Sequence, residues 1–241
     1  MDKQMEALAQ AMAPGRKTVF FGGAGVSTES GIPDFRSAGG IYGRQYAYPP
    51  EVMVSHSFFM AHPDEFYEFY RREMVWPRAK PNAAHIRLAE LEAEGRMTAV
   101  VTQNIDGLHQ MAGSKNVLEL HGSIHRNRCM RCGRKYGLEA ILTTDGVPRC
   151  ECGGIIKPDV VLYEEGLDNE VIERSIAHIR KADMLIIGGT SLVVYPAAGL
   201  IDYYHGNKLV LINKSATSRD GQADLVISDS IGKVLGDAVG V

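Results

Sequence analysis

The sequence predicts an α/β protein with a doubly wound parallel sheet and a second, smaller domain. The first supporting observation is a set of short apolar segments without polar alternation, which is typical of strands buried on both faces of a sheet. The second is the alternation of these segments with helical patterns, which implies parallel strands joined by crossover helices. The third is a group of four cysteines, all within 24 positions, that lies outside this alternation.

Four segments carry the predicted buried strands, namely residues 18–21, 98–101, 184–187 and 208–212. A further short strand is expected over residues 116–120. Each of the four is followed by small or polar residues. Ligands of open α/β sheets bind outside the carboxyl ends of the strands. We therefore expect a Rossmann-like sheet with one ligand crevice at this edge.

Helical patterns occupy the connections between the strands. Residues 82–94 begin at Asn82, a residue type that caps helix N-termini, and are followed by Gly95. Residues 168–182 begin with an aspartate and carry aliphatic side chains on one face. Further helices are expected over residues 196–204 and, as an amphipathic segment, near the N-terminus.

Two segments interrupt this alternation. One is aromatic and contains prolines, with a helix expected over residues 63–75, and the other contains the cysteines. We interpret both as insertions that form a small helical and zinc-ribbon domain over the crevice. The predicted division assigns residues 1–35, 82–122 and 158–241 to the Rossmann-like domain, and residues 36–81 and 123–157 to the small domain.

Composition and charge exclude several classes of function. The net charge is −3 and the nearest approach to a basic patch is residues 126–134, so no nucleic-acid partner is expected. No segment approaches the roughly 20 apolar residues of a membrane span, and residues 1–13 lack the apolar core of a signal peptide. We expect a cytoplasmic monomer in which the clustered cysteines bind metal rather than form disulfides.

A glycine-rich loop follows the first strand. In Gly23-Ala24-Gly25-Val26-Ser27 the glycines allow backbone N–H groups to approach a pyrophosphate, and the loop is expected to open a short helix. The dehydrogenase fingerprint is incomplete, because Thr28 replaces the third glycine and no acidic strand end follows at the usual spacing. The loop predicts phosphate binding without hydride transfer. Arg36 either clamps a phosphate or carboxylate or forms a surface pair with an aspartate.

Polar side chains follow two further strands. Gln103, Asn104 and Asp106 suit the recognition of a carboxamide and of ribose hydroxyls, although a turn held by Asn and Asp side chains explains them equally well. His121 precedes a glycine at another strand end and is a candidate general base near neutral pH. Other histidines, including His85, lie on predicted helices, where a satisfied or exposed role is expected.

The cysteines have the spacing of a metal site. Cys129 and Cys132 are separated by two residues, and Cys150 and Cys152 follow after 17 more. Four thiolates leave no open coordination position, so a zinc ion bound here is structural. The last pair is one residue shorter than usual, and the glycines that follow it give the backbone the freedom to turn both sulfurs inward.

Taken together, these motifs resemble the sirtuins, the NAD-dependent protein deacylases. The match follows the family's order over nearly the whole chain and consists of residues 23–27, 31–36, 102–106, 121–122, the cysteine pairs, 157–161, 189–192 and 212–213. The resemblance implies that the chain binds NAD as co-substrate and one structural zinc ion, and that its protein partners are acyl-lysine proteins or peptides.

The resemblance also implies roles for individual residues. NAD would be bound by Gly23, Ala24, Gly25, Ser27, Phe35, Arg36, Gln103, Asn104, Ile105, Asp106, Gly189, Thr190, Ser191, Asn213, Ser230 and Ile231. The acyl-lysine would be bound by Phe35, His121, Val160, Val161, Tyr163 and Val193. His121 and Asn104 would be catalytic, with His121 as the general base on a ribose hydroxyl. The substrate peptide would pair as a strand between residues 160–165 and the segment after Leu192.

The implied activity is NAD-dependent protein-lysine deacetylation, with deacylated lysine, nicotinamide and O-acetyl-ADP-ribose as products. One alternative is protein mono-ADP-ribosyl transfer from the same NAD site. Another is a zinc-ribbon module that senses NAD without turnover, but a sensor needs neither His121 nor Asn104.

Two departures from the family pattern affect the substrate. Glu164 replaces the usual glycine ahead of Glu165. The Tyr-x-x-Arg pair of succinyl- and malonyl-preferring members is incomplete, because Tyr67 is followed three residues later by Tyr70, with Arg71 next to it. We therefore expect acetyl and similar neutral acyl groups to be favoured.

Overall fold

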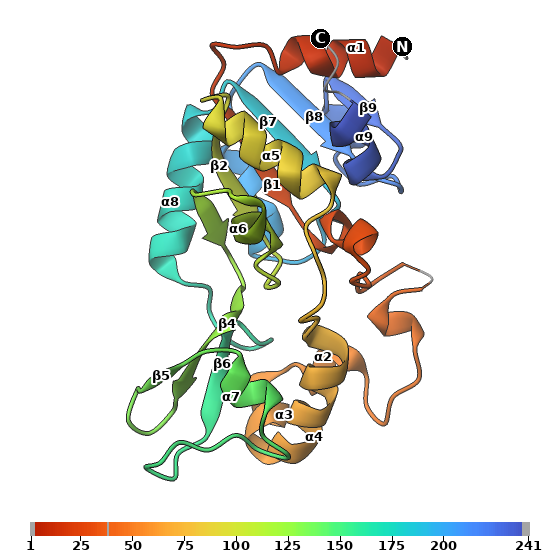
Figure 1. Cartoon of the computed structure of the whole chain (residues 1–241). Coiled ribbons are helices and arrows are strands. Elements are labelled where there is room, and N and C mark those ends of the chain that lie inside the picture. Colours follow the sequence, from red (N-terminus) through yellow and green to blue (C-terminus); the bar gives the residue numbers. More distant parts are fainter. Residues whose placement is uncertain (1–2, 38, 238–241) are drawn as a thin grey trace.

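A six-stranded parallel sheet forms the larger lobe of the protein, which occupies the upper part of Figure 1. The structure is a computed structural model and describes residues 3–37 and 39–237. The strand order is β3-β2-β1-β7-β8-β9. The strands are β1 (Thr18–Gly22), β2 (Met97–Thr102), β3 (Val117–Glu119), β7 (Met184–Gly188), β8 (Lys208–Ile212) and β9 (Leu225–Ile227). Residues 1–2, 38 and 238–241 of the predicted domains lie outside the described residues.

The direction in which strands are added reverses at β1. Strands β2 and β3 extend the sheet to one side of β1, and β7, β8 and β9 extend it to the other, with Gly22 of β1 paired with Gly188 of β7. This is the switch point at which α/β sheets bind ligands. The doubly wound sheet is therefore confirmed, whereas its edge strand β9 was not predicted from the sequence.

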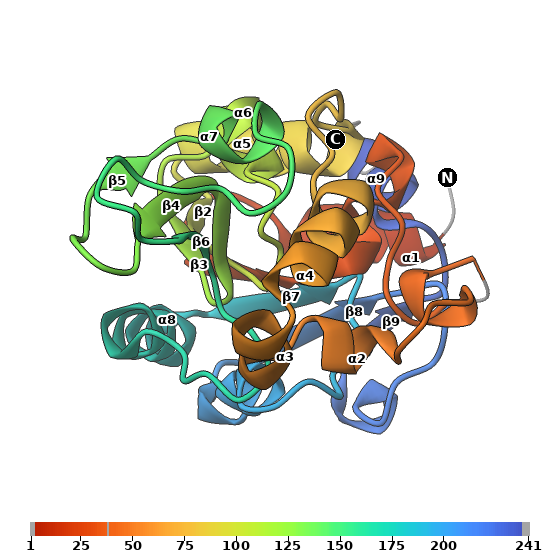
Figure 2. The ribbon, with the colours of Figure 1, turned by 90° about the horizontal axis from the view of Figure 1, so that it is seen from below.

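Helices cover both faces of the sheet, as Figure 2 shows from below. One face packs against α1 (Lys3–Ala11), α5 (Ala83–Ala93) and α9 (Ile231–Asp237), and α6 (Leu108–Ala112) lies beside α5. The other face packs against α8 (Asn169–Lys181) and a 3-10 helix (Ala197–Tyr203). Successive strand residues alternate between these cores, since Phe20 packs with Leu88 of α5 and Phe21 with Ile179 of α8. Burial on both faces explains why the strands are apolar without alternation.

Two predicted helices differ from those observed. The loop after β1 forms two short 3-10 turns, Ala24–Val26 and Thr28–Ser30, in place of a helix. The predicted helix over residues 196–204 is also 3-10 rather than α. By contrast, α5 begins at Asn82 as expected, with its side chain accepting a hydrogen bond from the N–H of Ala84.

The smaller lobe, in the lower part of Figure 1, joins the two insertions. Its antiparallel sheet has the order β5-β4-β6, from β4 (Gly122–Cys129), β5 (Lys135–Tyr136) and β6 (Ile156–Val160). Its helices are α2 (Pro50–Met53), α3 (His56–Ala61), α4 (Pro63–Phe69), which continues as a π-helical turn (Tyr70–Met74), and α7 (Glu139–Leu142). A 3-10 turn, Ile41–Gly43, lies in the first insertion, and another, Asp220–Gln222, lies between β8 and β9 of the larger lobe.

Aromatic side chains of α3 and α4 pack against this small sheet, with Phe59, Phe66 and Phe69 in one core with Ile156 and Cys129. The cysteine group is thus part of the core of the small lobe.

Within the described residues, no helix is long and apolar enough to span a membrane.

Candidate active site and metal centre

A cavity of about 740 Å³ lies where the carboxyl ends of the parallel strands meet the small lobe. Except for Val193, every residue predicted to contact NAD or the acyl-lysine lines this cavity. Val193 is 51% exposed, and the next residue, Val194, takes its place in the wall. Segments far apart in the sequence therefore form one site, as the convergence of the strand ends implied.

The glycine loop packs directly on the end of β7. The N–H of Gly25 donates to the carbonyl of Gly189 at 2.8 Å. A Cβ on Gly25 would lie 2.7 Å from the Gly189 Cα, which no side chain tolerates. Gly189 itself has φ +60°, in the left-handed region. The glycines are thus required because two backbones approach each other closely at the switch point between β1 and β7.

Ser27 is the centre of a buried hydrogen-bond network. Its hydroxyl donates to Asp106 Oδ2 at 2.7 Å and accepts from Asn104 Nδ2 at 3.1 Å. His85 Nε2 lies 3.5 Å from the same oxygen. The N–H of Asn82 donates to His85 Nδ1, so the neutral ring carries its proton on Nε2 and points it at Ser27. His85 is therefore satisfied, as expected, but it is also part of the site.

Burial has opposite effects on the charges of this network. It raises the pKa of Asp106, although hydrogen bonds from the Leu108 N–H and from Ser27 favour the carboxylate. It lowers the pKa of His85 to about 4, so this ring is neutral at pH 7. Ser27 thus links a neutral histidine and an amide to one carboxylate, which favours recognition of polar groups rather than of an anion.

Two further side chains connect the strand ends across the sheet. Gln103 Nε2, after β2, donates to Thr190 Oγ1 at 3.0 Å. Thr190, after β7, in turn pairs with Asn213, after β8, because its N–H donates to Asn213 Oδ1 and Asn213 Nδ2 donates to its carbonyl. This chain of contacts orients three of the predicted NAD-contacting residues relative to one another.

His121 lies between β3 and β4 and is partly buried. Its Nδ1 is 3.0 Å from the carbonyl oxygen of Gln103. Because a carbonyl only accepts, Nδ1 donates and the Nε2 lone pair is free to take a proton. Burial lowers the pKa of His121 against the opposing effect of this hydrogen bond, so the ring is neutral at pH 7. These are the requirements for a general base.

The loop after β6 is tied to the small lobe. The N–H of Tyr163 donates to the carbonyl of Val54, and the carbonyl of Tyr163 accepts from the N–H of His56, each at 3.0 Å. The hydroxyls of Tyr163 and Tyr42 are 3.1 Å apart. The predicted acyl-lysine wall is therefore built jointly by β6 and the first insertion.

Arg36 is exposed at the rim of the cavity. Its guanidinium lies over the ring of Tyr42, 5.1 Å from the centroid, and it forms no ion pair with a described carboxylate. The predicted surface pair with an aspartate is therefore not formed within the described residues. A cation held by an aromatic ring at the rim remains available to an anionic ligand.

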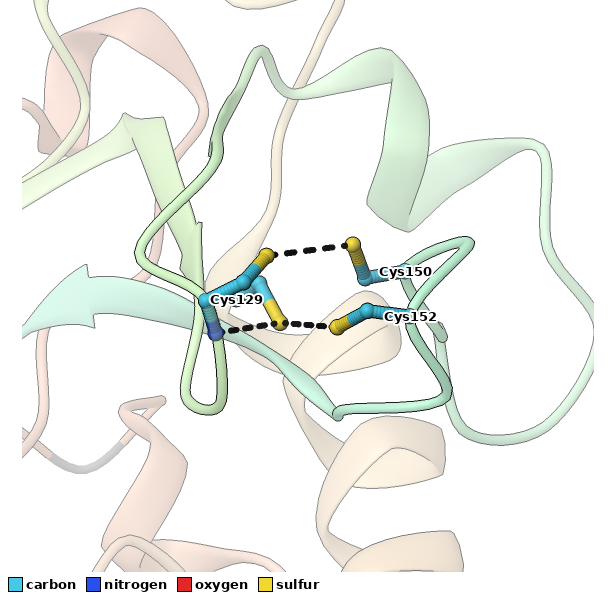
Figure 3. A group of neighbouring side chains, drawn as sticks. Cys129, Cys150 and Cys152 are labelled. Carbon is cyan, nitrogen blue, oxygen red and sulfur yellow. Dashed lines mark hydrogen bonds between the residues drawn. The ribbon is translucent and has the colours of Figure 1, made fainter.

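The four cysteines converge from two segments, and Figure 3 shows the labelled Cys129, Cys150 and Cys152 turned toward one another. All four Sγ atoms lie within 4.8 Å of each other, and all four thiols are free of disulfides. The contacts between Cys129 and Cys152, at 3.4 Å, and between Cys132 and Cys150, at 3.6 Å, approach the ~3.8 Å between ligands of a tetrahedral zinc ion. The donor set thus fits one structural zinc ion, despite the short final spacing.

Several cavity residues were not predicted from the sequence. They include Tyr42, Val54, Tyr70, Glu73 and Met74 from the first insertion, and residues 214–217 after β8. The sequence marked this insertion as aromatic, and only the tertiary structure shows which of its residues face the cavity. For His85 the spacing from Asn82 was a usable signal, because a capping box turns the third residue back toward the cap.

Comparison with known proteins agrees with this geometry. The model of the Sir2 family matches residues 23–196. The chain belongs to the Sir2 family. It is 63% identical over 239 residues to an NAD-dependent protein deacetylase of Clostridium acetobutylicum, covering 98% of this chain and 97% of that one. It is 60% identical over 243 residues to the same protein of Clostridium perfringens, covering 99% and 100%.

Solved Sir2 structures have the same fold. One, described as Sir2 with a p53 peptide and NAD+, superposes with a TM-score of 0.83 at 40% identity, covering 96% of this chain and 95% of that one. The sirtuin assignment, the Rossmann-like sheet and the four-cysteine cluster are therefore confirmed.

Proposed function

We propose that this Sir2-family protein is an NAD-dependent protein-lysine deacetylase, which converts acetyl-lysine, NAD and water into lysine, nicotinamide and O-acetyl-ADP-ribose. The observation that supports this best is the position of His121. It is a neutral imidazole whose tautomer is set by Gln103, and it lines the same cavity as the glycine loop and Asn104. A general base beside a phosphate-binding loop and an amide pocket is what the reaction needs.

The proposed roles follow from where the side chains lie. Ala24 of the glycine loop offers its backbone N–H to the pyrophosphate, since the N–H groups of Gly23 and Gly25 donate to the end of β7, and Arg36 at the rim offers its charge. Asn104 and Asp106, fixed by Ser27, face the nicotinamide amide. The acyl oxygen displaces nicotinamide from C1′ of the ribose. His121 Nε2 takes the proton of a ribose hydroxyl, which then attacks the acyl carbon, and water completes the release of free lysine. Zinc takes no part in these steps, because four thiolates complete its coordination.

Neutral acyl groups are proposed as the preferred substrates. Tyr70 and Met74 line the cavity, whereas Arg71 does not. Arg71 instead donates to the carbonyls of Ile141 and Gly146 and lies over the ring of Tyr67. The cation that a succinyl or malonyl carboxylate requires is thus held on the other side of α4.

The test is mass spectrometry of an acetyl-lysine peptide incubated with the protein, with and without NAD. We expect NAD-dependent loss of the acetyl group and an equal amount of nicotinamide. His121→Ala is expected to lose at least about 100-fold in turnover while keeping its fold, because it removes the general base. His205→Ala, at an exposed position, is the matched control.

Mono-ADP-ribosyl transfer predicts a different product, a protein that gains ADP-ribose and a peptide that keeps its acetyl group. NAD binding without either product would support the sensor instead. A fully active His121→Ala enzyme would exclude the proposed base. We further propose that the protein acts as a cytoplasmic monomer, which gel filtration and fractionation would test.

A further inference from the structure

Glu164 has a backbone conformation that side chains rarely adopt. Its φ is +75°, and among the described residues Leu192 is the only other non-glycine with positive φ. It lies in the loop between β6 and α8 and lines the cavity. The left-handed region is unfavourable for a residue with a Cβ, so surrounding contacts must hold it. At this position the sirtuin pattern has glycine, which needs no such support.

The contact that holds Glu164 is made by its own side chain. Glu164 Oε2 accepts from the backbone N–H of Ser57 at 2.9 Å and from the Ser57 hydroxyl at 2.5 Å. These hydrogen bonds lower the pKa of Glu164, so the carboxylate is charged at neutral pH. The Ser57 N–H lies in the first turn of α3, where it has no partner within the helix.

The residues on either side are fixed to the same element. Tyr163 exchanges backbone hydrogen bonds with Val54 and His56. Glu165 contacts His56 Nδ1 at 2.8 Å, Lys157 Nζ at 3.0 Å and the Leu162 N–H at 2.9 Å. The side chain of Glu164 thus adds a further connection between the loop and α3. Glu164 also lies beside Tyr163, whose side chain is 41% exposed and faces the proposed peptide site.

We propose that Glu164 is a positioning residue for the acyl-lysine peptide, because its carboxylate fastens the loop of residues 160–165 to α3. This inference rests on the proposed function, in which the peptide pairs with that loop as an added strand. A loop that is ordered before binding loses little entropy when the peptide docks. The contact therefore acts on peptide binding and leaves NAD binding and the chemical step unchanged.

The decisive experiment compares Glu164→Ala, Glu164→Gly and Glu164→Gln in steady-state deacetylation. Glu164→Ala removes the acceptor, so we expect the peptide KM to rise about tenfold with kcat and the NAD KM within about twofold. Glu164→Gln keeps an oxygen that accepts from Ser57 and is expected to restore the peptide KM. Glu164→Gly relieves the backbone strain but loses the acceptor, so its peptide KM should also rise.

Two further variants serve as controls. Ser57→Ala keeps the backbone donor and loses the hydroxyl, so a smaller rise is expected, and adding it to Glu164→Ala should change little. Glu173→Ala replaces an exposed glutamate of α8 and should match the wild type. The inference is overturned if Glu164→Gly has the wild-type peptide KM, or if Glu164→Gln is as impaired as Glu164→Ala.

Hydrogen exchange separates failure of this inference from failure of the proposed function. The amides of residues 161–166 are expected to exchange faster in Glu164→Ala than in the wild type and in Glu164→Gln, whether or not the wild type deacetylates the peptide. Unchanged exchange in Glu164→Ala would refute the fastening of the loop even in an active deacetylase. If the wild type does not deacetylate the peptide but the amides still exchange faster in Glu164→Ala, only the proposed reaction is refuted.

Discussion

The state of the histidines depends on which backbone groups surround them. His121 and His85 each make one backbone contact that determines the tautomer, a carbonyl for the first and an N–H for the second. The two rings consequently present opposite functions to the site, a free lone pair on His121 and a proton on His85. Sequence patterns identified His121 as reactive but could not assign its proton, because its partner is the carbonyl of Gln103 in another segment, whereas the partner of His85 lies in its own capping box.

Two adjacent buried histidines make the stability of the fold dependent on pH. The rings of His85 and His109 are 4.7 Å apart, and burial lowers their pKa values to about 4 and about 3. In the unfolded chain both protonate near pH 6.5. Stability is therefore complete above pH 6.5 and is lost as the pH falls toward the folded-state values.

The expected loss is at most about 1.4 kcal/mol per histidine for each pH unit below 6.5. Urea unfolding at pH 7, 6 and 5 measures it. His109→Phe should give a shallower dependence, because it removes one of the two groups, whereas His205→Ala at an exposed site should leave the slope unchanged. A free energy of unfolding that is flat between pH 7 and 5 would contradict the burial of uncharged rings.

Among the elements, the strands were the most predictable and the short helices the least. Five strands of the parallel sheet follow apolar runs within one or two residues, because burial on both faces demands such runs. The turn after β1 was expected to be helical, but contact with Gly189 compresses it into 3-10 turns. The boundaries of the two domains stay a prediction.

The contact between the glycine loop and β7 gives a test at this junction. Gly25→Ala places a Cβ 2.7 Å from the Gly189 Cα, so the two loops must separate. We expect NAD affinity to fall at least about tenfold and the protein to lose about 2 kcal/mol of stability. Calorimetric titration with NAD and urea unfolding measure the two effects. The matched control, Gly221→Ala, adds a Cβ with nothing within 4 Å and should change neither quantity.

In the whole molecule, the metal centre and the active site share one small sheet. Strand β4 starts one residue after His121 and ends at Cys129, and it pairs with β6, which leads into residues 160–165. Cys129 and Cys150 are buried in the core of the small lobe. Loss of zinc should therefore disturb the substrate wall, although no ligand sulfur approaches the cavity.

We expect a chelator, or Cys150→Ser, to remove the metal and to lower the melting temperature by roughly 10 °C. Because the six-stranded sheet has two cores of its own, NAD binding should be weakened less than peptide binding. Metal analysis, thermal unfolding and binding titrations follow these changes, and added zinc should reverse the effect of the chelator. A metal-free protein with unchanged melting and peptide affinity would show that the cluster has no structural role.

The sequence by itself determined the parallel sheet, the cysteine group and the strand ends at which the cavity lies. This was possible because apolar runs mark buried strands and because the carboxyl ends of parallel strands must meet at one edge. The tertiary structure alone decided that Ser27, His85 and Asp106 form one network, that Arg71 lies away from the cavity and that Glu164 contacts Ser57. Each of these joins segments far apart in the chain, and local patterns carry no information about such contacts.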